Sequence, residues 1–402
     1  MNVIVKFSFM EEWKTYKLGD LVNLYSGGTP NKSKAGYWGG SIPWISAKSM
    51  YEDFLSTSDL FITESGLKAG SKLAKKDTIL LLTRGSGLFN RIPVCWTERD
   101  LAFNQDVKNI VSKDDSVLLN QYLYYWLYGN KAGITAILET TGIGAGKIDT
   151  ERFLSLDVSI PSVDEQNRII RIVEPIFDKI AINNRINHNL EEQIQYRFDC
   201  MIMSENGLGY CQIADYVDVN PKRSLGKNVF AKCIDMSFLS TTGPFPSGWE
   251  TKGYNGGMKF LNGDTIMARI TPCLENGKVA FVNFLEDGEV AFGSTEYIVL
   301  HAKDGVAPVF TYFLARNKDF VDYATKNMNG SSGRQRVSGD TIEKYKIPVI
   351  DSDSLNEFSS FAAPAMEVIR NNSFENRSLA STRDALLPLL LSGNLSITQM
   401  NC

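Results

Sequence analysis

Histidines are rare in this chain of 402 residues, and its cysteines are few and scattered. The two histidines are His188 and His301, and none of the six cysteines forms a Cys-x-x-Cys pair. This pattern argues against a zinc site and leaves little material for histidine-based acid–base catalysis. We therefore expect no metal in this chain and structural roles for both histidines.

Long apolar runs are also lacking. The best candidates, Ile79–Leu82 and Leu386–Leu391, fall far short of the roughly 20 residues that span a bilayer. The first residues contain no small-residue cleavage site and turn acidic at Glu11 and Glu12, which argues against an export signal. We expect a cytoplasmic protein without a membrane segment, whose cysteines are reduced.

The net charge of −4 argues against a generic nucleic-acid binder, because phosphate contacts need local positive charge. The acidic excess is concentrated, however. Residues 163–205 carry five positive and eight negative charges, and residues 351–402 carry three and six. The other two parts of the chain are close to neutral, so the objection is weaker than the total suggests.

Sequence motifs of common nucleotide-binding and DNA-modifying enzymes are missing. The glycine-rich stretch that ends at Lys147 has Thr141 where a P-loop requires glycine, and Ile148 where it requires serine or threonine. The stretch Asn220–Lys222 lacks the second proline and the aromatic residue of amino-methyltransferases. We expect no catalytic residue and no bound cofactor in this chain.

What the sequence does contain is a faint internal repeat with an offset near 188 residues. Lys76–Ile79 matches Gly263–Ile266, and Ile160-Pro161 matches Ile347-Pro348. Two further features match in the same order: the aromatic runs at 122–127 and 308–314, which we interpret as amphipathic helices, and the glycine loops at 141–147 and 329–335. The chain is therefore predicted to be a duplication.

Within each half, short β-branched and apolar runs alternate with Gly, Pro and Asn turns, which predicts strands in a mixed α/β (α+β) domain. After each Ile-Pro boundary the pattern changes to helical spacing. We predict domains at 1–162 and 206–350, a central helix over 163–205 and a C-terminal helix over 351–402. The central helix, if continuous over 163–203, would be roughly 60 Å long at about 1.5 Å per residue.

Both predicted helices carry residues at alternating steps of three and four, which is the spacing of a coiled-coil seam. The seam residues predicted to pair the helices are Ile169, Val173, Ile176, Ile180, Asn183, Asn187 and Leu190 in the first and Phe358, Ile369, Asn372, Asn376 and Leu379 in the second. The asparagines have two interpretations. Buried, they would fix the register of the pair; alternatively, the helix turns a polar face there and they are solvated.

A glycine loop near the N-terminus contains the first candidates for nucleic-acid contact: Gly27, Gly28, Thr29, Lys32 and Lys34. Consecutive glycines allow another molecule to approach the backbone closely, and the polar side chains supply donors. The alternative is an ordinary glycine turn between two strands with surface lysines.

Further candidates follow predicted strands. They are Arg84, Ser86, Arg91 and Lys147 in the first half and Arg269, Thr271, Arg334, Gln335 and Arg336 in the second. Arginine can bind guanine with two hydrogen bonds, and glutamine suits adenine. Any single arginine is at least as well explained as a solvated or salt-bridged loop residue.

These features together resemble the specificity subunits of type I restriction-modification enzymes. The resemblance rests on Lys17–Asp20, Ser26–Pro30, Ile42–Ile45 and, most specifically, Ile160–Ile169, which is similar to the family's Ile-Pro-x-x-x-Glu-Gln-x-x-Ile helix entry. The second half departs from the pattern, since it lacks the Glu-Gln pair and the Gly-Gly-Thr-Pro loop.

The resemblance implies two target-recognition domains that each read part of a split, asymmetric site in double-stranded DNA, and two helices that pair antiparallel as a spacer. It further implies two modification (methyltransferase) subunits that bind S-adenosylmethionine and methylate adenine, and motor-nuclease restriction subunits that cleave. The chain itself would then be non-catalytic. Two alternatives stay open: a self-contained fused enzyme, and a coiled-coil adaptor that binds proteins without reading DNA.

Overall fold

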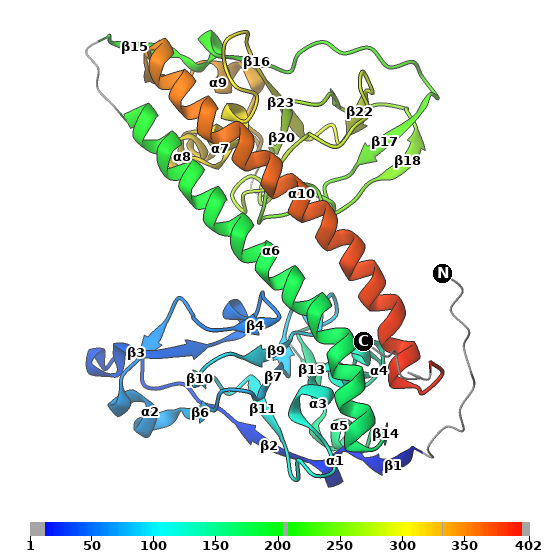
Figure 1. Cartoon of the computed structure of the whole chain (residues 1–402). Helices are drawn as coiled ribbons and strands as arrows, with labels where there is room; N and C mark the ends of the chain where they lie inside the picture. Colours follow the sequence, from blue (N-terminus) through cyan, green and yellow to red (C-terminus); the bar gives the residue numbers. More distant parts are fainter. Residues whose placement is uncertain (1–12, 143, 204–207, 332, 396–402) are drawn as a thin grey trace. The chain divides into compact units, whose positions relative to one another are not determined.

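The computed structural model describes residues 13–142, 144–203, 208–331 and 333–395 (Figure 1). The chain divides into two compact units. Unit 1 combines Met1–Ala181 with Arg377–Cys402, and unit 2 is Ile182–Asn376. Unit 1 is therefore discontinuous in sequence. No helix among the described residues is long and apolar enough to cross a membrane.

Unit 1 contains two main sheets and two small ones. The larger has the order β2 (Val22–Ser26), β11 (Val107–Ser112), β7 (Ile79–Leu82), β9 (Val94–Thr97), β4 (Phe54–Leu55). The other has the order β5 (Phe61–Ile62), β3 (Trp38–Ile45), β10 (Leu101–Phe103), β6 (Lys72–Ala74). The small sheets are β12 (Leu138–Thr140), β13 (Gly146–Ile148), β8 (Arg84–Gly85), and β1 (Lys14–Lys17) with β14 (Asp157–Ile160). Its short helices are α1 (Leu18–Leu21), α2 (Glu64–Gly70), α3 (Asn120–Gly129), α4 (Lys131–Ala136), α5 (Thr150–Leu154), and the 3-10 turns η1 (Ala35–Tyr37) and η2 (Ala47–Ser49).

Unit 2 is built in the same way. One sheet has the order β16 (Val217–Val219), β23 (Tyr297–Ala302), β20 (Asp264–Ala268), β21 (Val279–Phe281). The other has the order β18 (Glu250–Gly253), β17 (Phe230–Ile234), β22 (Ala291–Gly293), β19 (Lys259–Phe260), and β15 (Tyr210–Gln212) pairs with β24 (Lys346–Pro348). Its short helices are η3 (Ile213–Asp215), α7 (Phe310–Arg316), α8 (Lys318–Lys326) and α9 (Gly339–Glu343).

The two units share one topology, which confirms the predicted duplication. The order β2-β11-β7-β9 corresponds to β16-β23-β20-β21, and β5-β3-β10-β6 corresponds to β18-β17-β22-β19. A parallel pair also recurs at the same place, since β3 with β10 and β17 with β22 are both parallel. The predicted mixed α/β class with two similar domains and two long helices is correct.

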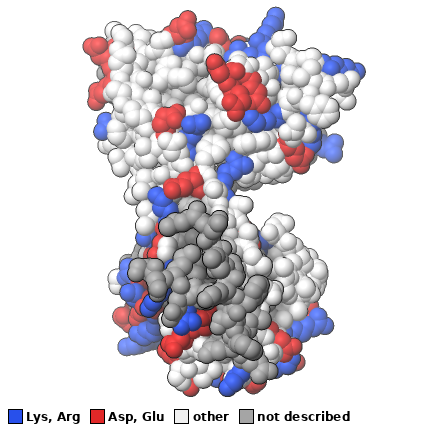
Figure 2. Space-filling view, turned by 45° about the vertical axis from the view of Figure 1, so that its right-hand side comes forward, with Lys and Arg blue, Asp and Glu red and all other residues white. Residues whose placement is uncertain are grey.

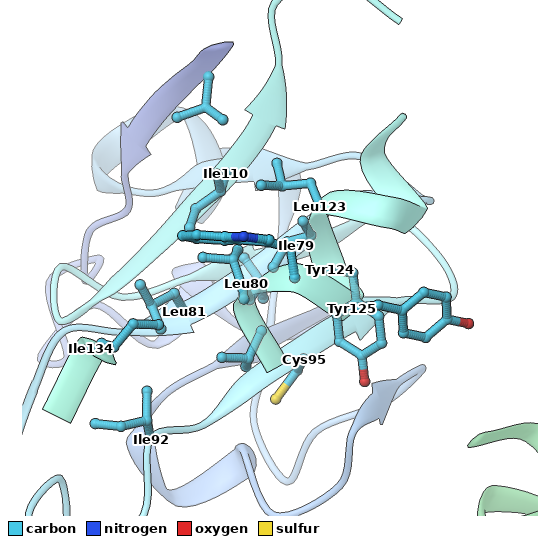
Figure 3. Close-up of a cluster of buried hydrophobic side chains, with 14 of the residues drawn as sticks. Ile79, Leu80, Leu81, Ile92, Cys95, Ile110, Leu123, Tyr124, Tyr125 and Ile134 are labelled. Carbon is cyan, nitrogen blue, oxygen red and sulfur yellow. The ribbon is translucent and has the colours of Figure 1, made fainter. Parts of the chain in front are cut away.

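The core of unit 1 forms where the larger sheet meets α3 (Figure 3). The four residues of β7 are all buried, as are all six residues Tyr122–Leu127 of α3. We predicted an amphipathic helix there, and that detail is wrong. The rings of Tyr124 and Tyr125 lie 5.8 and 5.0 Å from Phe177 of the long helix α6 (Val163–Met203), so α3 is covered by the sheet on one side and by a helix on the other.

The entry into α6 explains the most specific motif of the sequence. Gln166 is completely buried, accepts a hydrogen bond from the backbone N–H of Leu119, and donates to the carbonyls of Val117 and Pro161. A buried amide with three partners satisfies backbone groups that would otherwise be costly to bury. Gln166 thereby fastens the start of α6 to the segment that leads into α3.

The second long helix, α10 (Ser352–Leu391), pairs antiparallel with α6. In unit 1, Arg383 packs over Phe177, with the guanidinium carbon 5.3 Å from the ring centre. In unit 2, the ring of Phe198 lies 5.7 Å from that of Phe358. Residue numbers rise on one helix as they fall on the other, which is the signature of an antiparallel pair.

The asparagines hydrogen bond across this pair. Asn183 is 1% exposed and donates to Glu375 Oε2 at 2.8 Å and to Asn376 Oδ1 at 2.9 Å. Asn372 donates to Asn187 Oδ1 at 2.9 Å. Of the two interpretations, the structure therefore supports the polar contact within the seam over the solvated face.

The other seam residues are buried unequally. Ile169, Val173, Phe358 and Ile369 are buried. The half-buried members are Ile176, Ile180, Asn187, Leu190, Asn372, Asn376 and Leu379. Next to Ile176, Phe177 is 2% exposed and supplies the main contact. The seam drifts by one position there because the helix packs on its own domain as well as on its partner helix.

Candidate nucleic-acid interface

The glycine loop after β2 packs against its own domain. A Cβ on Gly27 would lie 2.2 Å from the carbonyl oxygen of Phe103, and one on Gly28 would lie 2.1 Å from that of Gly70. These distances are far inside any tolerated contact, so packing alone accounts for both glycines. The structure therefore favours the turn interpretation for these two positions.

The polar residues of the same loop are accessible to different degrees. The Thr29 hydroxyl is half-buried and donates to Gln105 Oε1 at 2.7 Å. Lys32 is exposed, and Lys34 Nζ lies 5.3 Å from the ring centre of Tyr37. Gln105 is itself exposed, and nothing in its sequence context drew attention to it.

Arg84 and Lys147 lie side by side, because β8 and β13 pair them directly. Two cations that sequence reasoning missed complete this region. Lys108 on β11 donates a hydrogen bond to the Ser26 hydroxyl, and Lys72 on β6 approaches the ring of Tyr25 at 6.0 Å. We call Lys72, Arg84, Lys108 and Lys147 the cation cluster.

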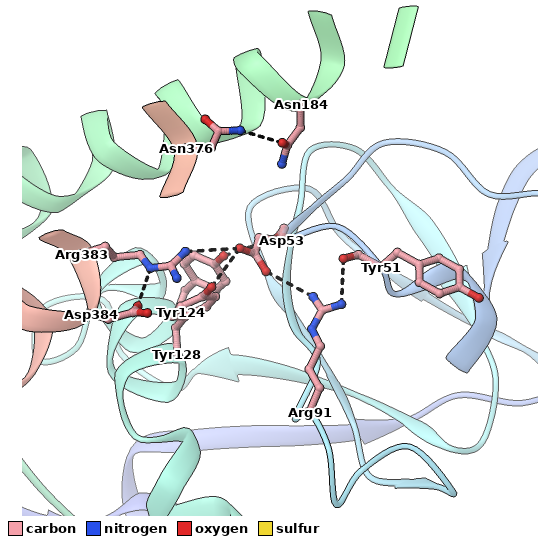
Figure 4. A network of polar contacts seen from close by, with 9 residues as sticks. All are labelled: Tyr51, Asp53, Arg91, Tyr124, Tyr128, Asn184, Asn376, Arg383 and Asp384. Atoms are coloured by element: carbon pink, nitrogen blue, oxygen red, sulfur yellow. Dashed lines mark hydrogen bonds and ion pairs between the residues drawn. The ribbon is translucent and has the colours of Figure 1, made fainter. Parts of the chain in front are cut away.

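Arg91 and Ser86 belong to the loop that follows β8, and they differ in their partners. Ser86 is exposed. Arg91 donates to the carbonyl of Tyr51 at 2.8 Å and contacts Asp53 at 3.5 Å (Figure 4). Arg91 is therefore held by its own domain, as the salt-bridged interpretation anticipated.

Asp53 also receives a hydrogen bond from the hydroxyl of Tyr128 at 3.1 Å and lies 4.0 Å from Arg383 of α10 (Figure 4). The guanidinium of Arg383 stacks 4.7 Å from the Tyr128 ring. Within unit 1, this network connects the Arg91 loop to the C-terminal helix. The network gives Arg91 partners within its own unit.

In unit 2, a single carboxylate holds two of the candidate arginines. Glu296 receives hydrogen bonds from Arg336 at 2.7–2.9 Å, and Arg269 lies 3.3 Å away. The hydrogen bonds from Arg336 lower the pKa of the Glu296 carboxyl. Arg334 is exposed, while Gln335 is half-buried.

Thr271 is the remaining candidate of unit 2. It is half-buried, and its hydroxyl donates to the sulfur of Met328 at 3.4 Å. The side chain of Thr271 therefore has a hydrogen-bond partner within its own unit.

Matching hydrogen bonds identify equivalent positions in the two units. Thr83 N–H donates to Asp106 O at 2.8 Å, and Arg269 N–H donates to Glu296 O at 3.0 Å. Thr83 O in turn accepts from Ile148, and Arg269 O from Val337. Asp106 therefore corresponds to Glu296, and Lys147 to Arg336. Among the residues described, Glu296 and Arg336 of unit 2 form an ion pair, whereas Asp106 and Lys147 of unit 1 do not.

The visible face of the molecule carries both signs of charge. Figure 2 shows Lys and Arg interspersed with Asp and Glu, rather than one continuous field of either sign. On the face shown, positive charge therefore does not form one broad basic surface.

The chain thus contains two α/β domains of one topology, each with cationic side chains at its strand ends. Residues 10–192 match the family model described as "Type I restriction modification DNA specificity domain". By sequence, the chain is 32% identical over 188 residues to the EcoR124I/EcoR124II specificity subunit of Escherichia coli, which is 46% of this chain and 45% of that protein. The chain thus aligns with less than half of that relative.

Other comparisons extend over the whole chain. The MjaIX specificity subunit of Methanocaldococcus jannaschii is 24% identical over 97% of this chain and 95% of its own length. The crystal structure of the type I restriction-modification S subunit from M. genitalium superposes with a TM-score of 0.58 at 13% identity and covers 98% of this chain and 99% of that one. Residues 10–192 thus resemble a type I restriction DNA specificity domain, and the whole chain is similar in sequence to a type I restriction specificity subunit.

Proposed function

We propose that this chain is the DNA-reading specificity subunit of a type I restriction-modification enzyme. Each α/β domain reads one part of a split, asymmetric site in double-stranded DNA. The observation that carries the proposal is the match of residues 10–192 to a DNA specificity domain, together with the recurrence of the same strand order in unit 2. A duplicated reader suits a site with two separate specific parts.

In this proposal the chain is non-catalytic. Two modification subunits bind S-adenosylmethionine and methylate adenine, and motor-nuclease restriction subunits cleave the DNA. The residues of this chain bind and position the duplex. Arg84, Lys147 and Arg334 are proposed DNA contacts because their side chains are exposed or half-exposed at strand ends and in a glycine loop.

The test is electrophoretic mobility shift with the assembled complex, competed by specific and by random duplex. We expect the specific duplex to compete at least 1000-fold better, in the range typical of sequence-specific proteins. Methylome sequencing of cells with and without the gene supplies the site: a bipartite methylated motif should disappear when the gene is deleted. Equal competition by both duplexes, with an unchanged methylome, would favour the protein-binding adaptor instead.

A further inference from the structure

The cation cluster holds positive charge that the domain itself leaves unbalanced. Its four side chains come from four strands, β6, β8, β11 and β13, and none forms an ion pair with a carboxylate among the described residues. Asp106 is the carboxylate that acts on Lys108, while Arg84 and Lys72 act on it with like charge. Asp106 offsets only part of the repulsion and desolvation, because the pKa of Lys108 stays lowered.

Lys108 is the best-placed member of this cluster. Its side chain is half-buried, and its ammonium group donates to the Ser26 hydroxyl on the neighbouring strand. Burial, followed by the charge of Arg84, lowers its pKa. An anion at this position would stabilise the charged form, because opposite charge offsets both the desolvation and the repulsion.

The corresponding site in unit 2 lacks this property. There Arg336, the equivalent of Lys147, is neutralised by Glu296 at 2.7 Å, and the strand position equivalent to Lys108 is the buried Ile298. The unbalanced cluster is thus a feature of unit 1 and does not follow from the shared topology.

We propose that Lys72, Arg84 and Lys108 form a binding site for a backbone phosphate of duplex DNA. Lys108 and Arg84 bind the phosphate oxygens, and Lys72 approaches from the side of Tyr25. Tyr25 is 44% exposed, so its ring can pack against the adjoining sugar. This site rests on the proposed function and adds to it. The phosphate contact fixes the register of unit 1 on the duplex and does not distinguish one base from another.

A phosphate is favoured over a carboxylate ligand because the donors come from three separate strands and act on one another as like charges. A tetrahedral group with several accepting oxygens can engage all of them, whereas a planar carboxylate offers two oxygens in one plane. The Ser26 hydroxyl, already a partner of Lys108, lies within this set of donors.

The experiment compares the double variant Lys72→Gln/Lys108→Met with the control Lys75→Gln in the assembled complex. Lys75 is an exposed lysine of the same domain that pairs with Asp100. Affinities for specific and random duplex are measured by fluorescence anisotropy from 50 to 200 mM salt. For the double variant we expect both affinities to weaken, a log–log salt slope lower by about 0.9, and an unchanged methylated motif. Over this salt range, that slope change corresponds to about 3.5-fold.

A phosphate scan locates the contact. Replacing one phosphate at a time by an uncharged methylphosphonate should reveal a position that weakens binding of the wild-type complex but not of the double variant. The proposal is overturned if the double variant keeps the wild-type salt slope, or if it changes the methylated motif. Failure of the proposed function looks different: the wild-type complex would then not discriminate between specific and random duplex at any salt concentration.

Discussion

Replacing Asn183 by leucine should stabilise the pairing of the two long helices. Asn183 is 1% exposed and donates two hydrogen bonds, yet its own carbonyl oxygen accepts none from the described residues. A buried acceptor without a partner costs about 1–3 kcal/mol, and each hydrogen bond contributes about 1 kcal/mol net. The side chain is therefore close to neutral for stability where it stands.

The magnitude follows from three contributions. Asn183→Leu loses two hydrogen bonds, or about 2 kcal/mol, and removes the unsatisfied carbonyl. It adds about 1.5–3 kcal/mol from burial of an apolar side chain. The net expectation is a gain of about 2 kcal/mol. In urea unfolding of the intact chain, the midpoint should shift upward with an unchanged slope.

The neighbouring Asn184 provides the matched control. It is exposed and accepts one hydrogen bond from Asn376 at 2.8 Å. Because water can replace this bond at an exposed site, Asn184→Leu should change stability by less than about 0.5 kcal/mol. The reasoning is refuted if Asn183→Leu is less stable than the wild type. Asparagine would then stabilise the helix pair, and a role limited to fixing its register would be excluded.

Three further outcomes are expected elsewhere in the chain. Arg383→Met should lower the urea midpoint by the equivalent of about 2 kcal/mol, because its guanidinium stacks on two rings while only 10% exposed. The Glu296 carboxyl has a lowered pKa, so it stabilises the fold above its ordinary pKa of 4.5, and this stabilisation is lost as pH falls through the lowered pKa. Glu296→Gln should therefore reduce the change in unfolding free energy with pH in this acidic range. An unchanged pH dependence would argue against the pairing with Arg336. Burial raises the pKa of the Cys95 thiol to about 12. Mass spectrometry after iodoacetamide treatment at pH 8 should therefore find the exposed Cys200 alkylated before Cys95. Equal alkylation rates at Cys200 and Cys95 would contradict the burial of Cys95.

Local patterns predicted the parts of the fold that depend on them. The duplication appeared as matched short segments, the short apolar run Ile79–Leu82 is a strand, and the long helix begins at Val163, where helical spacing was predicted to start. Gln166 was recognised as part of a motif, and the structure adds its reason: a buried amide that satisfies three backbone groups. The motif around Gln166 spans a few residues, whereas two of its hydrogen-bond partners, Leu119 and Val117, lie 47 and 49 residues away in sequence.

The candidate interface was less predictable, because its contacts join distant segments. Glu296 lies 40 residues from Arg336 in sequence, and only strand pairing brings them together. Lys72 and Lys108 are each ordinary polar positions on alternating strands, and nothing local distinguishes them. The glycines Gly27 and Gly28 looked like a contact loop, whereas their close packing on Phe103 and Gly70 emerges only in three dimensions.

The discontinuity of unit 1 has a consequence for synthesis on the ribosome. Leu387 and Leu390 of α10 belong to the core of the first domain, and residues 182–376 separate them from the rest of it. At about 5–20 residues per second, that intervening chain takes roughly 10–40 s to translate. During this interval the nascent first domain must wait with part of its apolar surface uncovered, so the last helix to emerge completes the first domain to be made.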